Sequence, residues 1–149
     1  MTRDGGLRQL FQKHLPEFFW QSIESWSTGQ GVPDLHYSIS IADHNWYNRS
    51  GWIECKQTEA NAVAISPEQV AWAERYWRHS GRSWLAVRQQ CYAGQRRKAQ
   101  DNLWLIHGDG ARWAKTGGLS AVPRIYLKGQ WSGGPGRWDW AAVKAILTS

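Results

Sequence analysis

A strand-like alternation runs through Gly51-Trp52-Ile53-Glu54-Cys55-Lys56-Gln57. Successive side chains of a β-strand point to opposite faces, so Glu54 and Lys56 share one face while Ile53 and Cys55 share the other. On the apolar face, Cys55 is expected to be a small buried residue. On the polar face, a carboxylate and an ammonium group lie close enough to act on one ligand.

A second carboxylate stands upstream, in Gly31-Val32-Pro33-Asp34. It opens an alternating apolar segment over residues 35–41, and the turn-forming residues that follow predict a hairpin between this segment and residues 52–56. If the two strands pair, Asp34 lies beside Glu54. Two carboxylates and a lysine that meet at one point suit a divalent hard cation and an activated water.

A capped helix follows the second strand. Ser66, Pro67 and Gln69 are the residue types found at the cap, first and third positions of a helix, and Gly81 marks its end after about His79. Gln69 either closes a capping box with Ser66 or points at the sheet and the acidic pair, because it lies within the apolar arc of the helix. The residues leave both interpretations open.

Hydrophobic spacing and turn residues divide the rest of the chain into short elements. Residues 17–26 fit either a helix or a strand. The other expected elements are an amphipathic helix over residues 7–15 capped by Asp4, buried strands at 83–88 and 103–107, a short helix at 110–115, a Gly-rich irregular segment at 129–136, and a closing helix at 137–147. This order of helices and strands predicts an α/β fold around a mixed sheet.

Composition limits the classes of protein to consider. The chain has 149 residues, 42% of them hydrophobic, which suits a single domain spanning 1–149. We expect no membrane span, because no apolar run reaches about 18 residues. Residues 1–6 lack the apolar segment of a secretory signal. The two cysteines suggest neither a disulfide framework nor a zinc site, so a reducing, cytoplasmic setting is expected.

Charge and aromatic content point to a phosphate-bearing partner. The net charge of +6 favours polyanions, including DNA. Twelve tryptophans are more than a core of this size needs. Most are expected to pack inside, and some are expected at the surface, where flat rings can stack on bases.

Pro33-Asp34 followed by Glu54-x-Lys56 resembles the signature of the PD-(D/E)xK nuclease superfamily. The wider pattern is similar to the VRR-NUC and Holliday-junction-resolvase-like branch, which includes small phage-type nucleases. Its parts are Ile23-Glu24-Ser25, Gly31-x-Pro33-Asp34, Glu54-x-Lys56-Gln57, Ser66-Pro67-Glu68-Gln69, and Gly81-Arg82 before an apolar strand. The resemblance implies a restriction-endonuclease-like αβββαβ core, with a central mixed sheet flanked by helices. That core would span residues 7–108, followed by a C-terminal extension, 109–149, of unknown role.

The same resemblance implies an Mg²⁺-dependent endodeoxyribonuclease, with Mn²⁺ as a substitute. The implied catalytic residues are Asp34, Glu54, Lys56, Gln69 and Glu24. The implied metal ligands are Asp34, Glu54, Glu24 and the backbone carbonyl of Cys55. Lys56 would orient the attacking water or stabilise the developing charge. Glu17 is the alternative to Glu24, which has the spacing that the resembled family shows.

DNA contacts are expected from Arg88, at the end of the strand over residues 83–88, and from the basic residues between the two buried strands. Arg88, Arg96, Arg97 and Lys98 either clamp phosphates beside the scissile bond or form a solvated hairpin tip. His36 shares a strand face with Asp34, and it either approaches the metal or DNA or is simply a satisfied polar residue. The resemblance implies branched or structured DNA as the substrate, such as four-way junctions or flaps. It also implies a homodimer, because two strands must be cut symmetrically.

Two other functions fit parts of the sequence. One is a DNA-binding module that keeps the same fold without catalysis. The other is a Trp-rich protein that binds single-stranded nucleic acid by stacking. Cleavage that depends on a divalent metal separates both from the nuclease.

Overall fold

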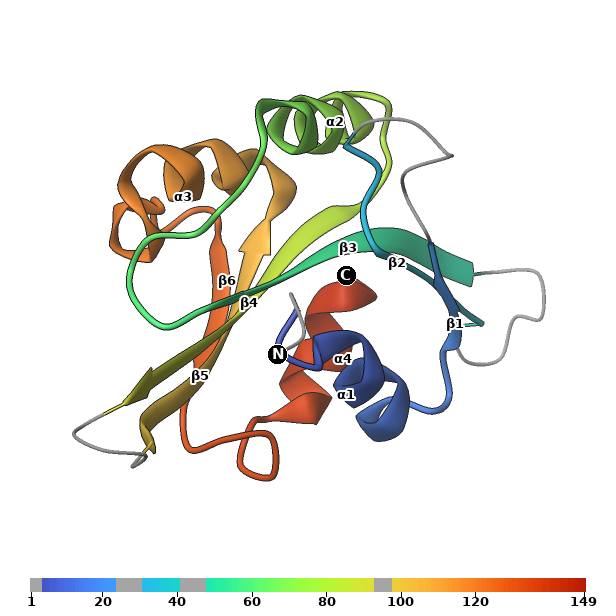
Figure 1. The fold of residues 1–149 in the computed structure, drawn as a ribbon. Helices are drawn as coiled ribbons and strands as arrows, with labels where there is room; N and C mark the ends of the chain where they lie inside the picture. The colour runs from blue at the N-terminus through green and yellow to red at the C-terminus, as the bar shows by residue number, and fades with distance from the viewer. Residues whose placement is uncertain (1–3, 24–30, 41–47, 93–97) are drawn as a thin grey trace.

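The computed structural model describes residues 4–23, 31–40, 48–92 and 98–149. The fold is α/β, with a six-stranded mixed sheet flanked by helices (Figure 1). In chain order the elements are α1 (Leu7–His14), β1 (Phe19–Ser22), β2 (Leu35–Ser40), β3 (Asn48–Thr58), α2 (Pro67–Arg78), β4 (Ser83–Tyr92), β5 (Lys98–His107), α3 (Ala111–Gly117), β6 (Leu127–Trp131) and α4 (Trp140–Leu147). Short 3-10 turns, η2 (Gly108–Gly110) and η3 (Leu119–Ala121), flank α3.

The strands lie in the order β1-β2-β3-β4-β5-β6, so each pairs with its neighbour in the sequence. Strands β3 and β4 run parallel, and the other pairs in the described sheet are antiparallel. A parallel pair needs a crossover connection, and α2 provides it. Helices α2 and α3 cover one face of the sheet, and α1 and α4 cover the other (Figure 1). From α1 to β4 the order is α-β-β-β-α-β, and β1 lies in the stretch that the sequence left open between helix and strand.

Both faces of the sheet are apolar where helices cover them. The core on the α1 and α4 side includes Phe11, Tyr37, Ile53, Leu105 and Leu147. The core on the α2 and α3 side includes Val70, Leu85, Val87, Ile106 and Ala114. Cys55 is only 2% exposed, which confirms that it is a small buried residue.

Tyr37 joins three parts of the first core. Its ring is fully buried, its hydroxyl donates to the Leu147 carbonyl at 2.7 Å, and the same oxygen accepts from Trp84 Nε1 at 2.8 Å. Gly51 lies opposite Tyr37 on β3, and a side chain there would meet the tyrosine hydroxyl. The hydroxyl therefore links β2, β4 and the end of α4 through a space that glycine leaves open.

Tyr37→Phe is expected to lower the free energy of unfolding by about 1–3 kcal/mol, because it leaves a buried carbonyl and a buried indole N–H without a partner. Urea unfolding followed by circular dichroism measures the change. Tyr92 is the matched control, because it is exposed and its conversion to phenylalanine should leave stability within about 0.5 kcal/mol. Equal unfolding free energies for the two variants would contradict the role given to the Tyr37 hydroxyl.

Residues 109–149 contribute a strand to the sheet and side chains to its core. Strand β6 pairs with β5, and α4 contributes buried Val143 and Leu147 to the α1 side of the sheet. Trp138 is buried, and its indole donates to the Asp101 carbonyl at 3.1 Å. None of the helices in the described part of the chain has the length and apolar character that crossing a bilayer requires.

The first helix is predicted correctly, but its cap differs. Gly6, in the left-handed conformation, is the N-cap residue of α1. Asp4 lies two residues earlier, and its carboxylate accepts hydrogen bonds from the backbone N–H groups of Gly6 and Arg8 at 3.0 and 3.3 Å. The carboxylate thus satisfies free N–H groups at the helix start from outside the cap position. The ambiguous stretch 17–26 contains β1, and its residues 24–26 lie outside the described residues.

Two predictions near the C-terminus were wrong in part. The Gly-rich segment 129–136 was expected to be irregular, but its residues 129–131 belong to β6. Gly129 pairs with Leu105 on β5 and leaves room for the ring of Trp131. The closing helix begins at Trp140 instead of residue 137. Asp139 caps it by accepting from the Ala142 N–H at 3.0 Å, which fixes the start.

Most described tryptophans pack against other rings and use the indole N–H as a link. Trp20, Trp77, Trp138 and Trp140 donate to the backbone carbonyls of Leu15, Ser83, Asp101 and Pro135. Trp113 is the described tryptophan with a largely exposed ring, at 47%. Trp26 and Trp46 lie outside the described residues. Internal packing with a hydrogen bond at the polar edge thus accounts for much of the tryptophan content.

Candidate active site

The hairpin of β2 and β3 brings the two predicted carboxylates together. Leu35 pairs with Ile53 and His36 with Trp52, so Asp34, just before β2, falls in register with Glu54. The Asp34 carboxylate accepts from the backbone N–H of Cys55 at 3.2 Å. Its backbone carbonyl accepts from the N–H of Ile23 at 2.8 Å. Asp34 is therefore held between the end of β1 and the middle of β3.

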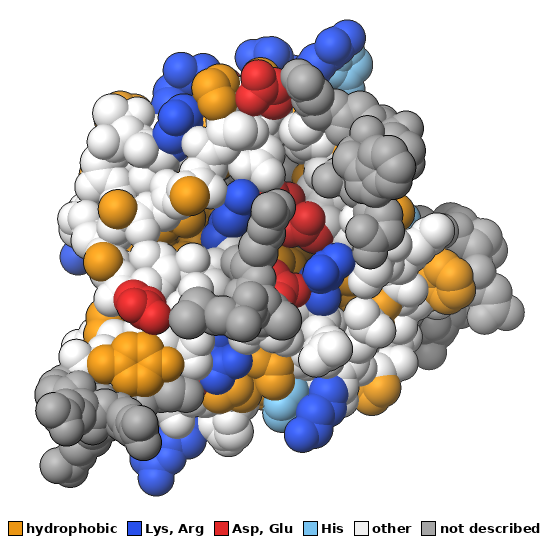
Figure 2. Space-filling view, in the orientation of Figure 1, with side chains coloured by type: hydrophobic (Ala, Val, Ile, Leu, Met, Phe, Trp, Pro, Cys, Tyr) orange, Lys and Arg blue, Asp and Glu red, His pale blue; other side chains and the backbone are white. Residues whose placement is uncertain are grey.

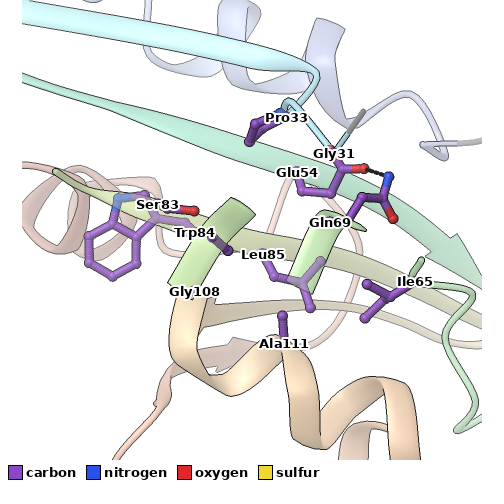
Figure 3. A pocket seen from close by; sticks show the side chains of 11 residues that line it. Gly31, Pro33, Glu54, Ile65, Gln69, Ser83, Trp84, Leu85, Gly108 and Ala111 are labelled. Atoms are coloured by element: carbon purple, nitrogen blue, oxygen red, sulfur yellow. Dashed lines mark hydrogen bonds between the residues drawn. The ribbon is translucent and has the colours of Figure 1, made fainter. Parts of the chain in front are cut away.

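Gly31 explains why the turn before Asp34 can pass so close to α2. Its φ is +85°, a conformation that favours glycine. A side chain at this position would also collide with the backbone of Glu68 in the first turn of α2. Gly31 and Pro33 line a small cavity together with Glu54 and Gln69 (Figure 3). The glycine thus lets the turn that carries Asp34 pack against the start of the helix.

Lys56 lies where the alternation predicts. Its ammonium nitrogen is 3.6 Å from Glu54 Oε1, and both side chains are mostly buried. Sequence spacing alone gave this pair, because the two residues share one face of a strand.

Gln69 fulfils both interpretations that the sequence left open. Its side-chain oxygen accepts from the Ser66 backbone N–H at 2.9 Å, and its backbone N–H donates to the Ser66 hydroxyl, which completes a capping box. Its amide nitrogen donates to Glu54 Oε1 (Figure 3). The capping bond fixes which end of the amide faces the sheet, so the donor points at the carboxylate.

Burial makes the acidic pair electrostatically unusual. Burial, and then the neighbouring Asp34 carboxylate, raise the pKa of Glu54 to about 8. Burial also raises the pKa of Asp34, although the Cys55 N–H and the charge of Arg8 act in the opposite direction. Glu54 Oε2 is buried and has no hydrogen-bond partner. Burial thus outweighs the nearby charges of Lys56 and Arg8, and the two carboxylates, one with an unsatisfied oxygen, lack sufficient positive charge.

A divalent cation fits this lack of charge. Carboxylate oxygens are the ligands that Mg²⁺ and Mn²⁺ prefer, and Mg²⁺ is often held by one or two carboxylates while it keeps several waters. Within the described ranges no group of three or more His, Cys, Asp and Glu side chains could hold a metal. The donors there are the carboxylates of Asp34 and Glu54. The Cys55 carbonyl as a third ligand stays a prediction.

Glu24 and Glu17 are the two candidates for the additional acid of the site, and the structure describes one of them. Glu24 lies outside the described residues. Glu17 forms an exposed ion pair with Lys144 of α4 at 3.4 Å, on the side of the sheet that α1 and α4 cover. It is thus engaged away from Gln69 and α2.

Arg8 is a residue near the site that the sequence did not single out. Its guanidinium pairs with Asp4 at 2.9 Å, and its charge lowers the pKa of Asp34. The spacing of Asp4 and Arg8, four residues apart, indicates a local ion pair. Nothing in the sequence says that this turn of α1 faces the start of β2, so the proximity could be found only in three dimensions.

Of the four basic residues predicted to contact DNA, Arg88 is the one whose side chain the structure describes. Arg88 forms a two-pronged ion pair with Asp101 at 2.9 and 2.7 Å, and it donates to the Gly5 carbonyl at 2.7 Å. These internal bonds give it a structural role and leave its side chain poorly placed to clamp a phosphate. Arg96 and Arg97 lie outside the described residues, as does the side chain of Lys98 at the start of β5.

His36 packs against an aromatic ring, and the described residues include no carboxylate paired with it. Its ring lies edge-on to Trp52, with ring centroids 4.7 Å apart. Burial lowers its pKa, so the ring is neutral near pH 7. It lies on the same face of β2 as Asp34, as the alternation predicted.

No protein-family model, curated protein or solved structure matched the chain. What the site can do therefore follows from its own residues. Two buried carboxylates share a deficit of positive charge, a lysine adjoins one of them, and an oriented glutamine amide holds that same carboxylate in place. This set suits metal-assisted hydrolysis of an anionic ester.

Proposed function

We propose that this protein is a metal-dependent nuclease and that Asp34, Glu54 and Lys56 form the site that hydrolyses DNA phosphodiester bonds. The observation that carries the proposal is the buried Glu54 carboxylate, which lies next to Asp34, contacts Lys56 and Gln69, and keeps one oxygen without a partner. The net charge of +6 supports a polyanionic substrate.

Each side chain has a distinct part in this reaction. Asp34 and Glu54 hold a divalent cation, which when bound supplies a Lewis acid for the phosphoryl oxygen and lowers the pKa of a coordinated water. Lys56 places a positive charge beside Glu54, where it orients the attacking water or stabilises charge that develops on the phosphate. Gln69 fixes the rotamer of Glu54 and so acts as a positioning residue.

The order of elements also supports the proposal. The chain from α1 to β4 has the α-β-β-β-α-β order of the PD-(D/E)xK superfamily that its motifs resemble. Asp34 at the start of β2, Glu54 and Lys56 on β3, and Gln69 on α2 are the positions that the resemblance implies. Branched or structured DNA as substrate, and a homodimer as the active form, are proposed on the same resemblance.

A titration of Mg²⁺ and Mn²⁺ against linear, supercoiled, flap and four-way DNA tests the proposal. We expect cleavage that requires either metal and ceases in chelator, with flap or four-way substrates cut faster than linear duplex. Gel electrophoresis of labelled strands gives both the rate and the position of each cut. Binding to every substrate with no cleavage in either metal would favour the inactive DNA-binding module instead.

A further inference from the structure

An aromatic groove lies on α2, beside the acidic pair. Trp72, Arg75, Tyr76 and His79 line it, and its volume is about 310 Å³; we call it the α2 groove. The rings of Trp72 and Tyr76 stack with centroids 4.8 Å apart and an angle of 18° between their planes. The stacked rings thus form an aromatic wall of the groove, with the Arg75 side chain next to them.

Contacts between α2 and β3 link the α2 groove to the acidic pair. Gln69 on α2 contacts Glu54 on β3, and Trp72, one turn further along α2, contacts Trp52, two residues earlier on β3. The contacts therefore run in opposite sequence directions along the helix and the strand. Because two residues of a strand span about 7 Å, the aromatic wall begins close to Glu54.

Gly81 holds the wall in shape. A side chain on Gly81 would collide with the ring of Tyr76, so the ring lies directly against the backbone there. The Gly81 N–H also donates to the Tyr76 carbonyl at 2.9 Å. The Gly81 position, which helix termination alone would explain, thus also supports the aromatic ring from behind.

The charge of the groove selects its ligand. Arg75 and His79 are its ionisable lining residues apart from Tyr76, both are exposed, and no acidic side chain is among the residues that line it. Figure 2 shows Lys and Arg side chains and a histidine along the edge of the molecule that α2 forms, with an acidic side chain among them. A flat ring next to positive charge suits a base that is attached to a phosphate.

We propose that the α2 groove is a stacking subsite for an unpaired nucleotide of the DNA strand that is bound at the acidic pair. The location next to a scissile bond rests on the proposed function, whereas the binding itself does not. Inside a duplex, neighbouring pairs cover both faces of each base, so an unpaired base is the one that can stack on the groove side of the Trp72–Tyr76 ring pair. The substrate class is therefore DNA with a single-stranded segment at the cleavage site.

Binding in chelator tests this inference without cleavage. The probes are a dye-labelled oligothymidine of about 12 nucleotides and a labelled duplex of equal length, followed by fluorescence anisotropy. Trp72→Leu and Tyr76→Leu are each expected to weaken single-strand binding about 5- to 100-fold while duplex binding changes less than about threefold. Tyr76→Phe keeps the ring and should retain binding within about twofold.

One control variant and one further test variant keep the result interpretable. Trp113→Leu removes an exposed ring on α3 that does not line the groove, and it should leave single-strand binding unchanged. The double variant Arg75→Gln, His79→Gln changes only exposed side chains, so it reports on the groove even if Trp72→Leu is poorly folded. Circular dichroism and thermal melting check the fold of each variant.

The outcomes separate this inference from the proposed function. Unchanged single-strand affinity in the folded Tyr76→Leu and double variants, or an equal loss in Trp113→Leu, would overturn the stacking subsite. If cleavage still depended on metal and on Asp34 in that case, the proposed nuclease function would remain supported without the stacking subsite. Selective loss of single-strand binding without any cleavage by the wild-type protein would support the subsite and refute the nuclease.

Discussion

Asp34→Asn is expected to reduce DNA cleavage in Mg²⁺ by about 10³-fold or more. The substitution keeps the shape of the side chain and an oxygen that can accept from the Cys55 N–H, but it removes a negative charge that the metal needs. A bound metal contributes several kcal/mol of charge stabilisation, and each 1.4 kcal/mol is about tenfold in rate. Lys56→Ala is expected to lose about 10²–10³-fold, because it removes one charged donor near the reacting phosphate.

Matched controls for these variants are available on the surface. Asp139→Asn makes the same chemical change at an exposed helix cap, where asparagine caps as well as aspartate. Lys115→Ala removes an exposed lysine on α3. Both should cleave at the wild-type rate, and DNA affinity of all four variants should stay within about threefold. Full cleavage by Asp34→Asn in Mg²⁺ would remove the proposed site.

The second large effect is a loss of stability as pH rises in metal-free buffer. The pKa of Glu54 is about 8 in the folded protein and is lower when the chain is unfolded. Between these two pKa values the folded state binds more protons than the unfolded state, so the free energy of unfolding falls as pH increases. The full contribution is present below about pH 4 and is lost by about pH 8, a change of about 4 kcal/mol.

Glu54→Gln removes this titrating group together with its coupling to Asp34. His14, His36 and His107 have lowered pKa values, so they make stability rise with pH, but they do so equally in both proteins. The difference between wild type and Glu54→Gln should therefore grow in favour of the variant from pH 5 to pH 8. Urea unfolding in chelator at constant ionic strength measures it. Parallel stability curves would show that Glu54 does not titrate as a buried acid.

Metal should reverse this effect in the wild type but not in Glu54→Gln. Ligands bind a cation in their deprotonated form, so Mg²⁺ is expected to stabilise the wild-type protein more at pH 8 than at pH 5. Glu74→Gln is the matched control, because Glu74 is paired with Arg112 in a surface ion pair that lowers its pKa. That variant should behave like the wild type in both conditions.

The acidic pair was predictable because each part has a local signal. Alternation placed Glu54 and Lys56 on one face, and turn residues indicated the hairpin that aligned Asp34 with Glu54. Gln69 was found through the spacing of a helix cap. These inferences succeed because a strand has a period of two and a cap has fixed positions, so side-chain direction follows from residue number.

Arg8 and Arg88 show where such reasoning stops. Both are basic residues on regular elements, and the sequence predicted an anion contact for Arg88 but did not single out Arg8. In the folded chain, Arg88 is committed to Asp101 and Gly5, whereas Arg8 lies near Asp34. Their partners come from segments that are far away in sequence, and no local pattern encodes which segments meet.

The sequence by itself determined the α/β class, the strand faces around Glu54 and the capped start of α2, because all three depend on interactions between residues a few positions apart. Only the tertiary structure decided that β6 and α4 complete the core, that Glu54 is buried with an unsatisfied oxygen, and that Trp72 and Tyr76 form a wall beside it. Burial and long-range contact depend on how whole elements pack, and packing is a property of the complete chain.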